Sequence, residues 1–353
     1  MDISKPDISI IIPTYNEQQQ LPVLLESLSK QQDISIQIII VDGGSSDETL
    51  LICETFANNH NGLLLNSRAS RPAQMNLGAK HADSPLLLFL HADTTVTDDR
   101  LLITAVQHFR QQNKVTNQGN MAGHFSLEFY DTEEAHPKGF YFYAAKTSLN
   151  RADTINGDQG LMISTAFFMT VSGFDESLHF MEDARIATKI FEHGEWFTLP
   201  GTIYTSARRF VTEGLVERQI LNAFLCNFNH IGLQRFFELA QSAYQSQTDT
   251  RALQMRPFLG AVTQLMRELG IIKSIKMWYQ VGAYVASNTW QLIFKLDCDR
   301  HFKMGEPAAK VTPRYLAQFD RYFAWFFRLS PIKAITGILT FIWFNSLWIR
   351  YQK

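Results

Sequence analysis

LLLFLHADTT, residues Leu86–Thr95, is an apolar run that stops abruptly at His91-Ala92-Asp93. A continuous run of four to eight apolar residues is typical of a strand that is buried on both faces, as at the centre of a parallel sheet. In open α/β sheets the ligand binds beyond the carboxyl ends of such strands. Asp93 is therefore either a site residue or a cap for the helix expected at Asp98–Arg110.

The sequence on either side of this run alternates between strand and helix signals. A β-branched run at Ile8–Ile12 precedes an apolar helical periodicity at Gln18–Lys30. The same order recurs, and the further expected elements are strands at Ile36–Val41 and Leu63–Leu65 and a helix through Met75 and Ala79. Alternation of this kind predicts an α/β fold with a mostly parallel, doubly wound sheet.

Composition narrows the classes of protein that fit. Charged residues make up 19% and hydrophobic residues 46% of the 353, which predicts a folded core rather than disorder. A net charge of −2 and the absence of any basic run argue against electrostatically driven nucleic-acid binding. Three widely spaced cysteines favour a reducing compartment, and the N-terminal MDISKPDISI lacks the apolar core of a signal peptide. We therefore expect a cytoplasmic location.

Acidic and polar side chains follow three of the expected strands. Right-handed crossovers bring the ends of parallel strands to one rim of the sheet, so these side chains are expected to meet there. Neither a GxGxxG after the first strand nor a P-loop is present, which disfavours a dinucleotide or Walker-type phosphate site. Carboxylate oxygens suit Mg²⁺ or Mn²⁺ better than zinc. The rim residues are Tyr15, Glu17, Asp42, His91 and Asp93.

Two arginines lie near this rim. Arg68 and Arg71 follow the strand expected at Leu63–Leu65. Each is either a contact for the phosphates of a ligand, offsetting the repulsion from the acids, or a solvated surface charge.

Two segments of the first half resemble the opening of family 2 glycosyltransferases. They are Ile10–Glu17 (IIIPTYNE) and Ile40–Asp47 (IVDGGSSD). The resemblance, closest to a small bacterial branch of the family, covers about residues 8–235. It implies an A-type nucleotide-sugar fold and a donor that is a UDP- or GDP-linked sugar. The residues that it assigns to the nucleotide are Pro13, Tyr15, Glu17 and Asp42.

The resemblance also aligns His91-Ala92-Asp93 with the Asp-x-Asp metal motif of the family. Asp93 then stands as the metal-side carboxylate for Mg²⁺ or Mn²⁺. The sequence departs from the motif at His91, which is a second metal ligand, a diphosphate contact or a packing residue.

An acidic pair opens a helix downstream of Gly173-Phe174-Asp175. Acids are ordinary in a first helical turn, because the helix dipole favours them. The family has a Glu-Asp pair at this point, and the resemblance implies that Asp183 is the catalytic base of an inverting displacement, with Glu182 beside it. Asp158, in Asn156-Gly157-Asp158-Gln159, either forms a turn or faces the sugar or acceptor pocket.

Arg208 and Arg209, followed by Phe210, loosely resemble the Arg-Trp element that follows the base in processive members, so either arginine is expected to cover the diphosphate. The longer Gln-x-x-Arg-Trp motif is absent, which disfavours polymer synthesis. We expect the glycosyltransferase domain to occupy residues 1–240 and a helical region to occupy residues 241–353.

The helical region carries three signals. Asp297-Cys298-Asp299-Arg300-His301 is read as a loop in preference to a metal cluster. Tyr315–Leu329 places aromatic residues on one helical stripe beside a basic line, and Pro331 is expected to end that helix. Ala334–Ile349 is apolar but shorter than the ~20 residues of a spanning helix.

These C-terminal signals favour peripheral membrane contact at the inner face of the cell membrane over a buried helical hairpin or a true span. The leading function is an inverting, metal-assisted glycosyltransferase whose hydroxyl acceptor is lipid-linked. The alternatives are a non-catalytic nucleotide-sugar-binding or scaffold protein on the same fold, and a nucleotidyltransferase, which PTYNE disfavours because it is not a glycine-rich basic loop.

Overall fold

The computed structural model describes residues 5–60, 62–116, 119–130, 137–178, 181–245 and 252–352. The chain divides into two compact units. The first, called the sheet unit here, comprises Met1–Asp131 and Gly139–Ser206, and the second, the helical unit, comprises Thr132–Lys138 and Ala207–Lys353. The boundary at residue 240 expected from the sequence stays a prediction about the extent of the glycosyltransferase domain.

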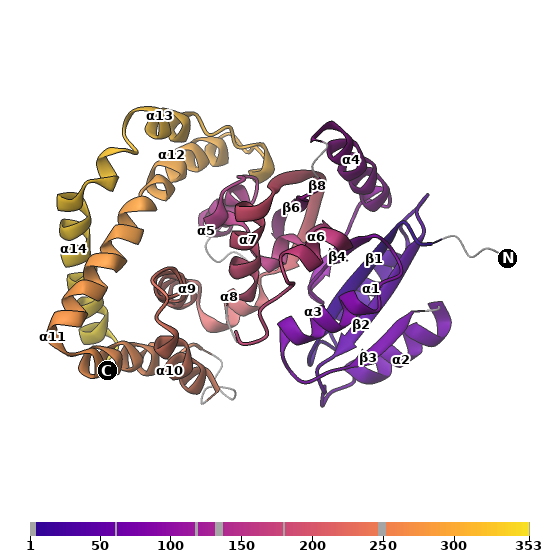
Figure 1. The fold of residues 1–353 in the computed structure, drawn as a ribbon, viewed down its shortest axis with the longest axis horizontal. Coiled ribbons are helices and arrows are strands. Elements are labelled where there is room, and N and C mark those ends of the chain that lie inside the picture. Colours follow the sequence, from indigo (N-terminus) through magenta and orange to yellow (C-terminus); the bar gives the residue numbers. More distant parts are fainter. Residues whose placement is uncertain are drawn as a thin grey trace. The chain divides into compact units, whose positions relative to one another are not determined.

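An eight-stranded sheet forms the centre of the sheet unit, in the order β3-β2-β1-β4-β7-β6-β8-β5 (Figure 1). The strands are β1 (Ile8–Thr14), β2 (Ile36–Asp42), β3 (Leu63–Asn66), β4 (Leu86–Phe89), β5 (Thr94–Thr95), β6 (Met121–Tyr130), β7 (Leu161–Ser164) and β8 (Glu195–Ser206).

Strand direction decides which loops meet. The pairs β1·β2, β1·β4, β2·β3 and β6·β8 are parallel, so Thr14 pairs with Asp42 at the end of both strands. β7 runs antiparallel to β4 and β6, and its first residue, Leu161, pairs with Phe89 at the end of β4. The loop that enters β7 therefore lies beside the loop that leaves β4. The predicted doubly wound sheet is confirmed, and it is a mixed sheet in which β7 runs antiparallel to β4 and β6 and β5 runs antiparallel to β8. Antiparallel β7 adds a loop to the rim.

Helices cover both faces of the sheet, as a doubly wound fold requires. Alternate residues of β1 pack on opposite sides, because Ile10 and Ile12 join one core cluster and Ile11 joins the other. A Cβ at Gly78 would lie 2.5 Å from the Ile11 side chain, so glycine allows the close approach of this helix. The helical elements are α1 (Leu21–Ser29), α2 (Thr49–His60), α3 (Arg71–Lys80), α4 (Leu101–Thr116), α5 (Pro137–Lys146), η1 (Ala152–Thr154), η2 (Gly157–Gln159), α6 (Thr165–Thr170) and α7 (Glu182–His193).

The helical unit is built from helices and short 3₁₀ turns (Figure 1). Its longest helix, α11, is kinked at Gly270, whose φ of 72° is left-handed and suits glycine. The elements are α8 (Arg208–Glu213), α9 (Leu215–His230), α10 (Gln234–Gln245), α11 (Met255–Ser287), α12 (Trp290–Lys303), η3 (Ala308–Lys310), α13 (Arg314–Tyr322), η4 (Phe326–Arg328) and α14 (Ser330–Arg350).

Two of the predictions for the C-terminal region are wrong in detail. The segment at 297–301 is not a loop but part of α12, and the buried Asp297 carboxylate accepts the backbone N–H groups of Tyr315 and Leu316 at 2.9 and 3.0 Å. It satisfies donors at the start of α13, which explains an acid at a buried position. The helix expected over Tyr315–Leu329 ends at Tyr322, and Pro331 does not end a helix but stands in the first turn of α14, where its missing N–H costs nothing.

Helix α14 is also longer than its apolar segment suggested. It has 21 residues, and among the described residues it is the helix long and apolar enough to cross a membrane by length and composition. Only 17% of its most apolar window is buried within the protein.

Candidate functional site

The loops after β1 and β2 are tied to each other by side chains. Asn16, at a φ of 55°, donates its backbone N–H to the Ser45 hydroxyl at 2.9 Å and accepts the Ser46 N–H at 2.8 Å. Asn tolerates this left-handed conformation better than most residues. In the expected nucleotide-binding segment, Tyr15 projects to solvent with 52% of its surface exposed. An exposed ring beside two locked loops is available to stack on a base.

Other residues of this segment have structural tasks. The buried Asp42 carboxylate accepts the N–H groups of Gly44 and Ser45 at 2.8 and 2.9 Å and the Ser45 hydroxyl at 2.5 Å. Asp42 therefore holds its own turn. Pro13 lies within β1, and the Glu17 side chain is almost fully buried. Nucleotide contacts by these residues stay predictions.

Gln74, which was not among the predicted site residues, links the ends of β1 and β2. Its buried amide donates to the carbonyls of Thr14 and Val41 at 2.8 and 2.7 Å. The two carbonyls belong to the last two residue pairs of β1 and β2, so the amide ties the ends of these strands together. A lone Gln on an apolar helix face, in RPAQMN, was the available signal.

Asp183 is held rigidly at the start of α7. One carboxylate oxygen, Oδ2, accepts the Gly157 backbone N–H at 2.8 Å, and Oδ1 accepts the N–H of Ala184 at 2.8 Å. The residue before the helix, Met181, adopts a left-handed φ of 64°, a conformation that bulky residues rarely adopt outside sites that require it. The carboxylate predicted to be the base thus has a fixed orientation and a favourable helix dipole.

Glu182 and Arg71 form an ion pair next to it. The Arg71 guanidinium at the start of α3 donates to the Glu182 carboxylate at 3.0 Å, and the Glu182 side chain is only 5% exposed against 40% for Arg71. Burial raises the pKa of Glu182, an effect that Arg71 opposes and Asp183 reinforces. Burial lowers the pKa of Arg71, but nearby carboxylates outweigh it and raise that pKa. In falling order of effect the acids are Glu182, Asp183, Asp158 and Asp93.

His91 and Asp158 make the second polar pair of the site. His91 Nδ1 lies 2.8 Å from Asp158 Oδ1, which joins the loop after β4 to the loop before β7. Gly157 lies between this pair and Asp183, since a Cβ there would stand 2.6 Å from His91 Cε1 and Nε2. A cavity of about 20 Å³, room for one water molecule, adjoins His91, Glu182 and Asp183.

A buried hydrogen-bond network holds the loop of Asp158, and its residues were also not among the predicted ones. The Gln159 side chain accepts the Asn156 N–H at 2.8 Å and donates to the Thr147 carbonyl and to His124 Nδ1, both at 3.0 Å. His124 Nε2 in turn lies 2.8 Å from Asn150 Oδ1. Burial lowers the pKa of His124, so the ring stays neutral with one nitrogen accepting from Gln159.

The oxygen donors of the site suit a hard divalent cation. Asp93, Asp158, Asp183 and Glu182 all act electrostatically on Arg71, and clustered carboxylates repel one another unless a cation lies among them. The described residues nevertheless contain no preformed group of three or more His, Cys, Asp or Glu side chains that could hold a metal ion. Asp93 itself is half-buried, and its backbone carbonyl accepts the Tyr130 hydroxyl at 3.2 Å. Its role as a metal ligand, like that of His91, stays a prediction.

The three other predicted residues are arginines on other elements. The Arg68 guanidinium pairs with Glu176 at 3.0 Å in an exposed ion pair, and Glu176 also accepts from Asn76. Arg208 and Arg209 belong to the first turn of α8 in the helical unit. Contacts of these three arginines with a diphosphate stay predictions.

An α/β fold with a rim of fixed carboxylates is compatible with the resemblance to glycosyltransferases, and comparison with known proteins supports it. Residues 9–176 match the model of glycosyl transferase family 2. This part of the chain is a family 2 glycosyltransferase domain.

Two curated relatives and one solved structure show the extent of the likeness. The chain is 39% identical over 97 residues to a PGL/p-HBAD biosynthesis glycosyltransferase of Mycobacterium bovis, covering 27% of this chain and 38% of that protein. It is 37% identical over 93 residues to an undecaprenyl-phosphate 4-deoxy-4-formamido-L-arabinose transferase of Proteus mirabilis, covering 24% and 28%. S. aureus TarS in complex with UDP is 19% identical over 89% of this chain and 91% of that chain, with a TM-score of 0.48.

Proposed function

We propose that this protein is an inverting glycosyltransferase that transfers a sugar from a UDP- or GDP-linked donor to an acceptor hydroxyl. The observation that supports this proposal most directly is the fixed carboxylate of Asp183. Two backbone N–H groups hold it at the carboxyl rim of the sheet, beside the Arg71–Glu182 ion pair. The family 2 domain over residues 9–176 supports the same class of reaction. Because the matched stretch spans 38% of the first curated relative, the activity of the whole protein is inferred from the domain and the site.

The proposed reaction is one in-line displacement. The acceptor oxygen attacks the anomeric carbon while the bond from that carbon to the diphosphate oxygen breaks, and Asp183 takes the acceptor proton. With Asp183 held in place, much of the rate comes from the alignment of the two substrates. Arg71 and the exposed Tyr15 are assigned to the diphosphate and the base of the donor.

A divalent cation, Mg²⁺ or Mn²⁺, fits the oxygen-rich rim, with Asp93 as its carboxylate ligand and His91 beside it. Such an ion stabilises the charge of the departing nucleoside diphosphate. His91 is also paired with Asp158, so its second nitrogen is the one free to face a ligand. The pairing favours the reading of His91 as a positioned site residue over that of a packing residue.

The acceptor proposed here is lipid-linked. The name of the Proteus relative contains undecaprenyl-phosphate, a lipid carrier, and the helical unit carries an apolar helix that is largely exposed. Both observations favour an acceptor that resides in a membrane.

The test is a thermal-shift screen of UDP- and GDP-sugars with and without Mn²⁺, followed by release of the nucleoside diphosphate in the presence of lipid-linked acceptors that carry a free hydroxyl. A ligand that binds the folded state raises the melting temperature. We expect a shift that chelation with EDTA reduces. Equal shifts of the melting temperature with and without the metal would contradict the assignment of Asp93 as a metal ligand.

The second candidate is a non-catalytic nucleotide-sugar-binding protein. Asp42 accepts hydrogen bonds from its own turn, and Arg68 forms an ion pair with Glu176, so some of the predicted site residues have a structural role. A thermal shift without turnover over a broad acceptor panel would favour this candidate and would contradict transferase activity.

A further inference from the structure

Helix α14 is apolar on both of its faces. Gly337, Phe344 and Leu347 form its buried face within the helical unit. The opposite face carries Ile338 and Ile342, which are 61% and 57% exposed. A helix on a water-exposed surface normally presents polar residues outward, so this arrangement needs an apolar or interfacial environment.

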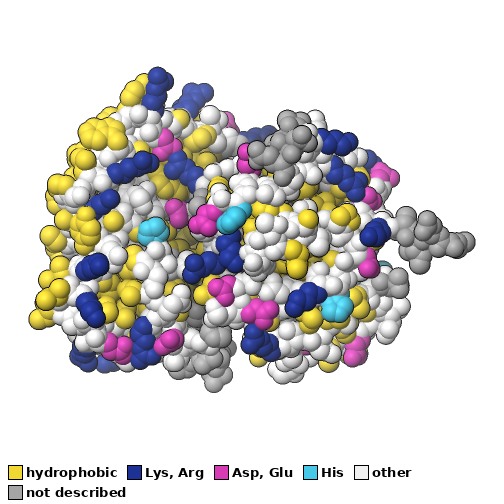
Figure 2. Space-filling view, viewed as in Figure 1, with side chains coloured by type: hydrophobic (Ala, Val, Ile, Leu, Met, Phe, Trp, Pro, Cys, Tyr) yellow, Lys and Arg dark blue, Asp and Glu magenta, His cyan; other side chains and the backbone are white. Residues whose placement is uncertain are grey.

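Neighbouring segments extend the exposed apolar surface. Figure 2 shows hydrophobic side chains gathered along the left edge of the view, where α11 and α14 lie in Figure 1, with Lys and Arg between them. The surface is called the docking face here, and its exposed large hydrophobic residues are Ile271, Ile272, Ile275, Tyr322, Phe323, Trp325, Phe326, Leu329, Ile335, Ile338, Leu339, Ile342 and Ile349. Aromatic residues of this kind are enriched at the headgroup level of bilayers.

The charges around the docking face are mostly positive, although the whole chain has a net charge of −2. Residues 314–350 contain one acid, Asp320, among several bases. The bases of this stretch and of the exposed part of α11 are Lys273, Lys276, Arg314, Arg321, Arg328, Lys333 and Arg350. Basic groups interleaved with apolar ones complement an anionic lipid surface.

Close packing fixes α14 to α11. A Cβ at Gly282 of α11 would lie 2.2 Å from the Gly337 backbone nitrogen, so the two helices touch through their backbones. Trp278 of α11 also packs on Phe344, with ring centroids 5.5 Å apart. The two helices therefore form one antiparallel pair whose exposed face runs along the helices rather than at an end.

We propose that the docking face inserts in the plane of an anionic lipid bilayer and holds the protein there as a peripheral protein. A span would place Lys273 and Lys276 in hydrocarbon, which is costly. A second copy of the chain is a poorer occupant, because a two-fold contact sets the same basic patch against itself. Docking is a separate property from sugar transfer and does not depend on it.

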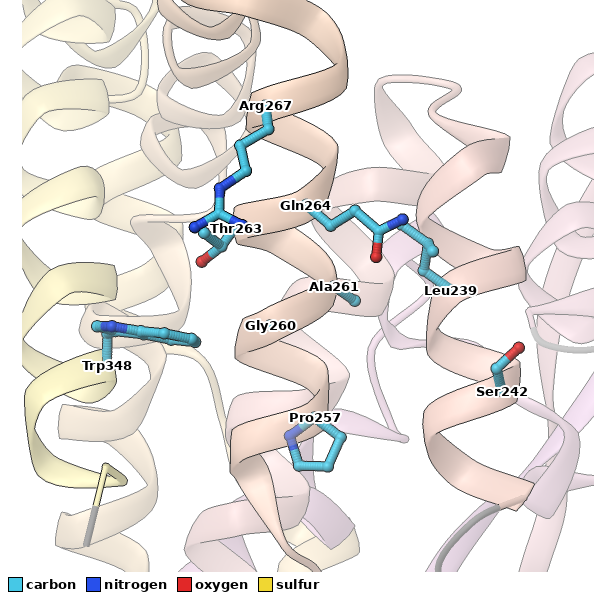
Figure 3. A pocket seen from close by; sticks show the side chains of 9 residues that line it. All are labelled: Leu239, Ser242, Pro257, Gly260, Ala261, Thr263, Gln264, Arg267 and Trp348. Carbon is cyan, nitrogen blue, oxygen red and sulfur yellow. The ribbon is translucent and has the colours of Figure 1, made fainter.

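A groove of about 500 Å³ in the same unit provides a place for a lipid phosphate. In Figure 3, Trp348 extends from α14 toward α11, and the Arg267 side chain descends to the same side of α11. Ile349 follows Trp348 directly, and Ile271 follows Arg267 across the kink at Gly270, so residues of the groove and of the docking face are neighbours in the sequence. A guanidinium beside an indole suits the phosphate of a headgroup.

Flotation of the full chain with vesicles tests the proposal. We expect binding to vesicles of phosphatidylglycerol and phosphatidylcholine, weaker binding to phosphatidylcholine alone, and loss of the difference at high salt. The double variant Ile338→Asn, Ile342→Asn should partition at least tenfold more weakly. The matched control is Leu51→Asn on α2 of the sheet unit, where an equally exposed (62%) leucine should leave binding unchanged.

Three outcomes would overturn the proposal. They are no flotation of the wild type with anionic vesicles, equal flotation of the double variant and the Leu51 control, or resistance of the bound protein to alkaline carbonate, which indicates a span. Melting curves of each variant show whether it is folded. Light scattering gives the oligomeric state. If the wild type and the Leu51 control are dimers, the double variant is a monomer, and the wild type does not bind vesicles, the docking face is a contact between two copies of the chain.

Discussion

The two units treat apolar and charged side chains in opposite ways. Among the described residues, the exposed large hydrophobic side chains of the sheet unit are scattered, and they are Tyr15, Val23, Leu51, Met169 and Phe191; all the others belong to the helical unit. Four acids of the sheet unit, Asp93, Asp158, Glu182 and Asp183, act electrostatically on Arg71 at one rim, whereas the helical unit exposes isoleucine and tryptophan side chains. A sheet covered on both faces by helices buries nearly all of its apolar surface, and a helix pair with one free face does not.

The difference suggests that the two units have separable tasks. We propose the chemistry for the sheet unit, where loops from distant parts of the chain are held around Asp183. We propose membrane attachment for the helical unit. Changes in one unit should therefore leave the property of the other intact, and each of the following predictions tests that separation.

The largest effect is expected from Asp183→Asn. An amide cannot take the acceptor proton, so the turnover rate should fall by about 10²–10⁴-fold, the range for loss of a general base. The nucleotide-sugar thermal shift and vesicle flotation should persist, and initial-rate kinetics measure the loss. Glu192→Gln, an exposed acid near the other end of the same helix, is the control. Normal turnover in Asp183→Asn would show that Asp183 is not the base.

A smaller loss is expected from Arg71→Ala, which leaves the buried Glu182 without its partner. We expect the free energy of unfolding to fall by about 1–2 kcal/mol, the lower part of the range for an unpaired buried group, because solvent screens the partly exposed Arg71. Chemical denaturation measures this change. Arg68→Ala breaks an exposed pair with Glu176 and should cost about 0–1 kcal/mol.

The loss in Arg71→Ala should also depend on pH. The pKa of Glu182 is raised above its ordinary 4.5 by burial, and removal of Arg71 raises it further. The folded variant then binds a proton on Glu182 more tightly than the unfolded chain does. The stability that this proton contributes is fully present below pH 4.5 and is lost as the pH rises through the pKa of Glu182 in the folded state. The variant should therefore be less impaired at pH 5 than at pH 8. An equal loss at both pH values would contradict burial as the cause of the shift.

A third pair of changes compares one glycine from each unit. Gly157→Ala places a methyl group 2.6 Å from the His91 ring, so the ring or the loop must shift and the carboxylate of Asp183 loses its alignment. We expect a fall in turnover of about tenfold, less than the roughly 10²-fold that a 1 Å misplacement can cost, because the ring or the loop can yield. Initial rates and melting curves measure both effects. Turnover equal to that of the wild type would mean that the loop geometry does not matter for the reaction.

The smallest effect is expected from Gly260→Ala in α11. A Cβ there meets nothing within 4 Å, and alanine favours a helix interior by roughly 0.5–1 kcal/mol over glycine. The melting temperature should rise slightly with turnover unchanged. A fall in turnover without a change in vesicle binding would break the assignment of chemistry to the sheet unit alone.

Most strands of the first half were predictable because buried strands read as short β-branched or leucine runs. The ends of these runs also predicted the rim that carries Asp42 and the loop of His91 and Asp93. Two supports of the rim, Gln74 and Gln159, were not predictable. Gln74 donates to the carbonyls of Thr14 and Val41, which lie far away in the chain. Gln159 accepts the N–H of nearby Asn156, but its bonds to Thr147 and His124 join it to other elements. In the C-terminal region, Asp297 looked like a loop acid because the donors it caps belong to another helix.

By itself the sequence determined the strand–helix alternation, the position of the acids at strand ends and the apolar character of the last helix, because each depends on local pattern and composition. Only the tertiary structure decided that β7 runs antiparallel and brings Asp158 to His91 and Gly157 to Asp183. It also decided which face of α14 is left exposed. The physical reason is the same in both cases. Strand direction and helix packing are set by contacts between segments distant in the chain, whose free energy no local pattern contains.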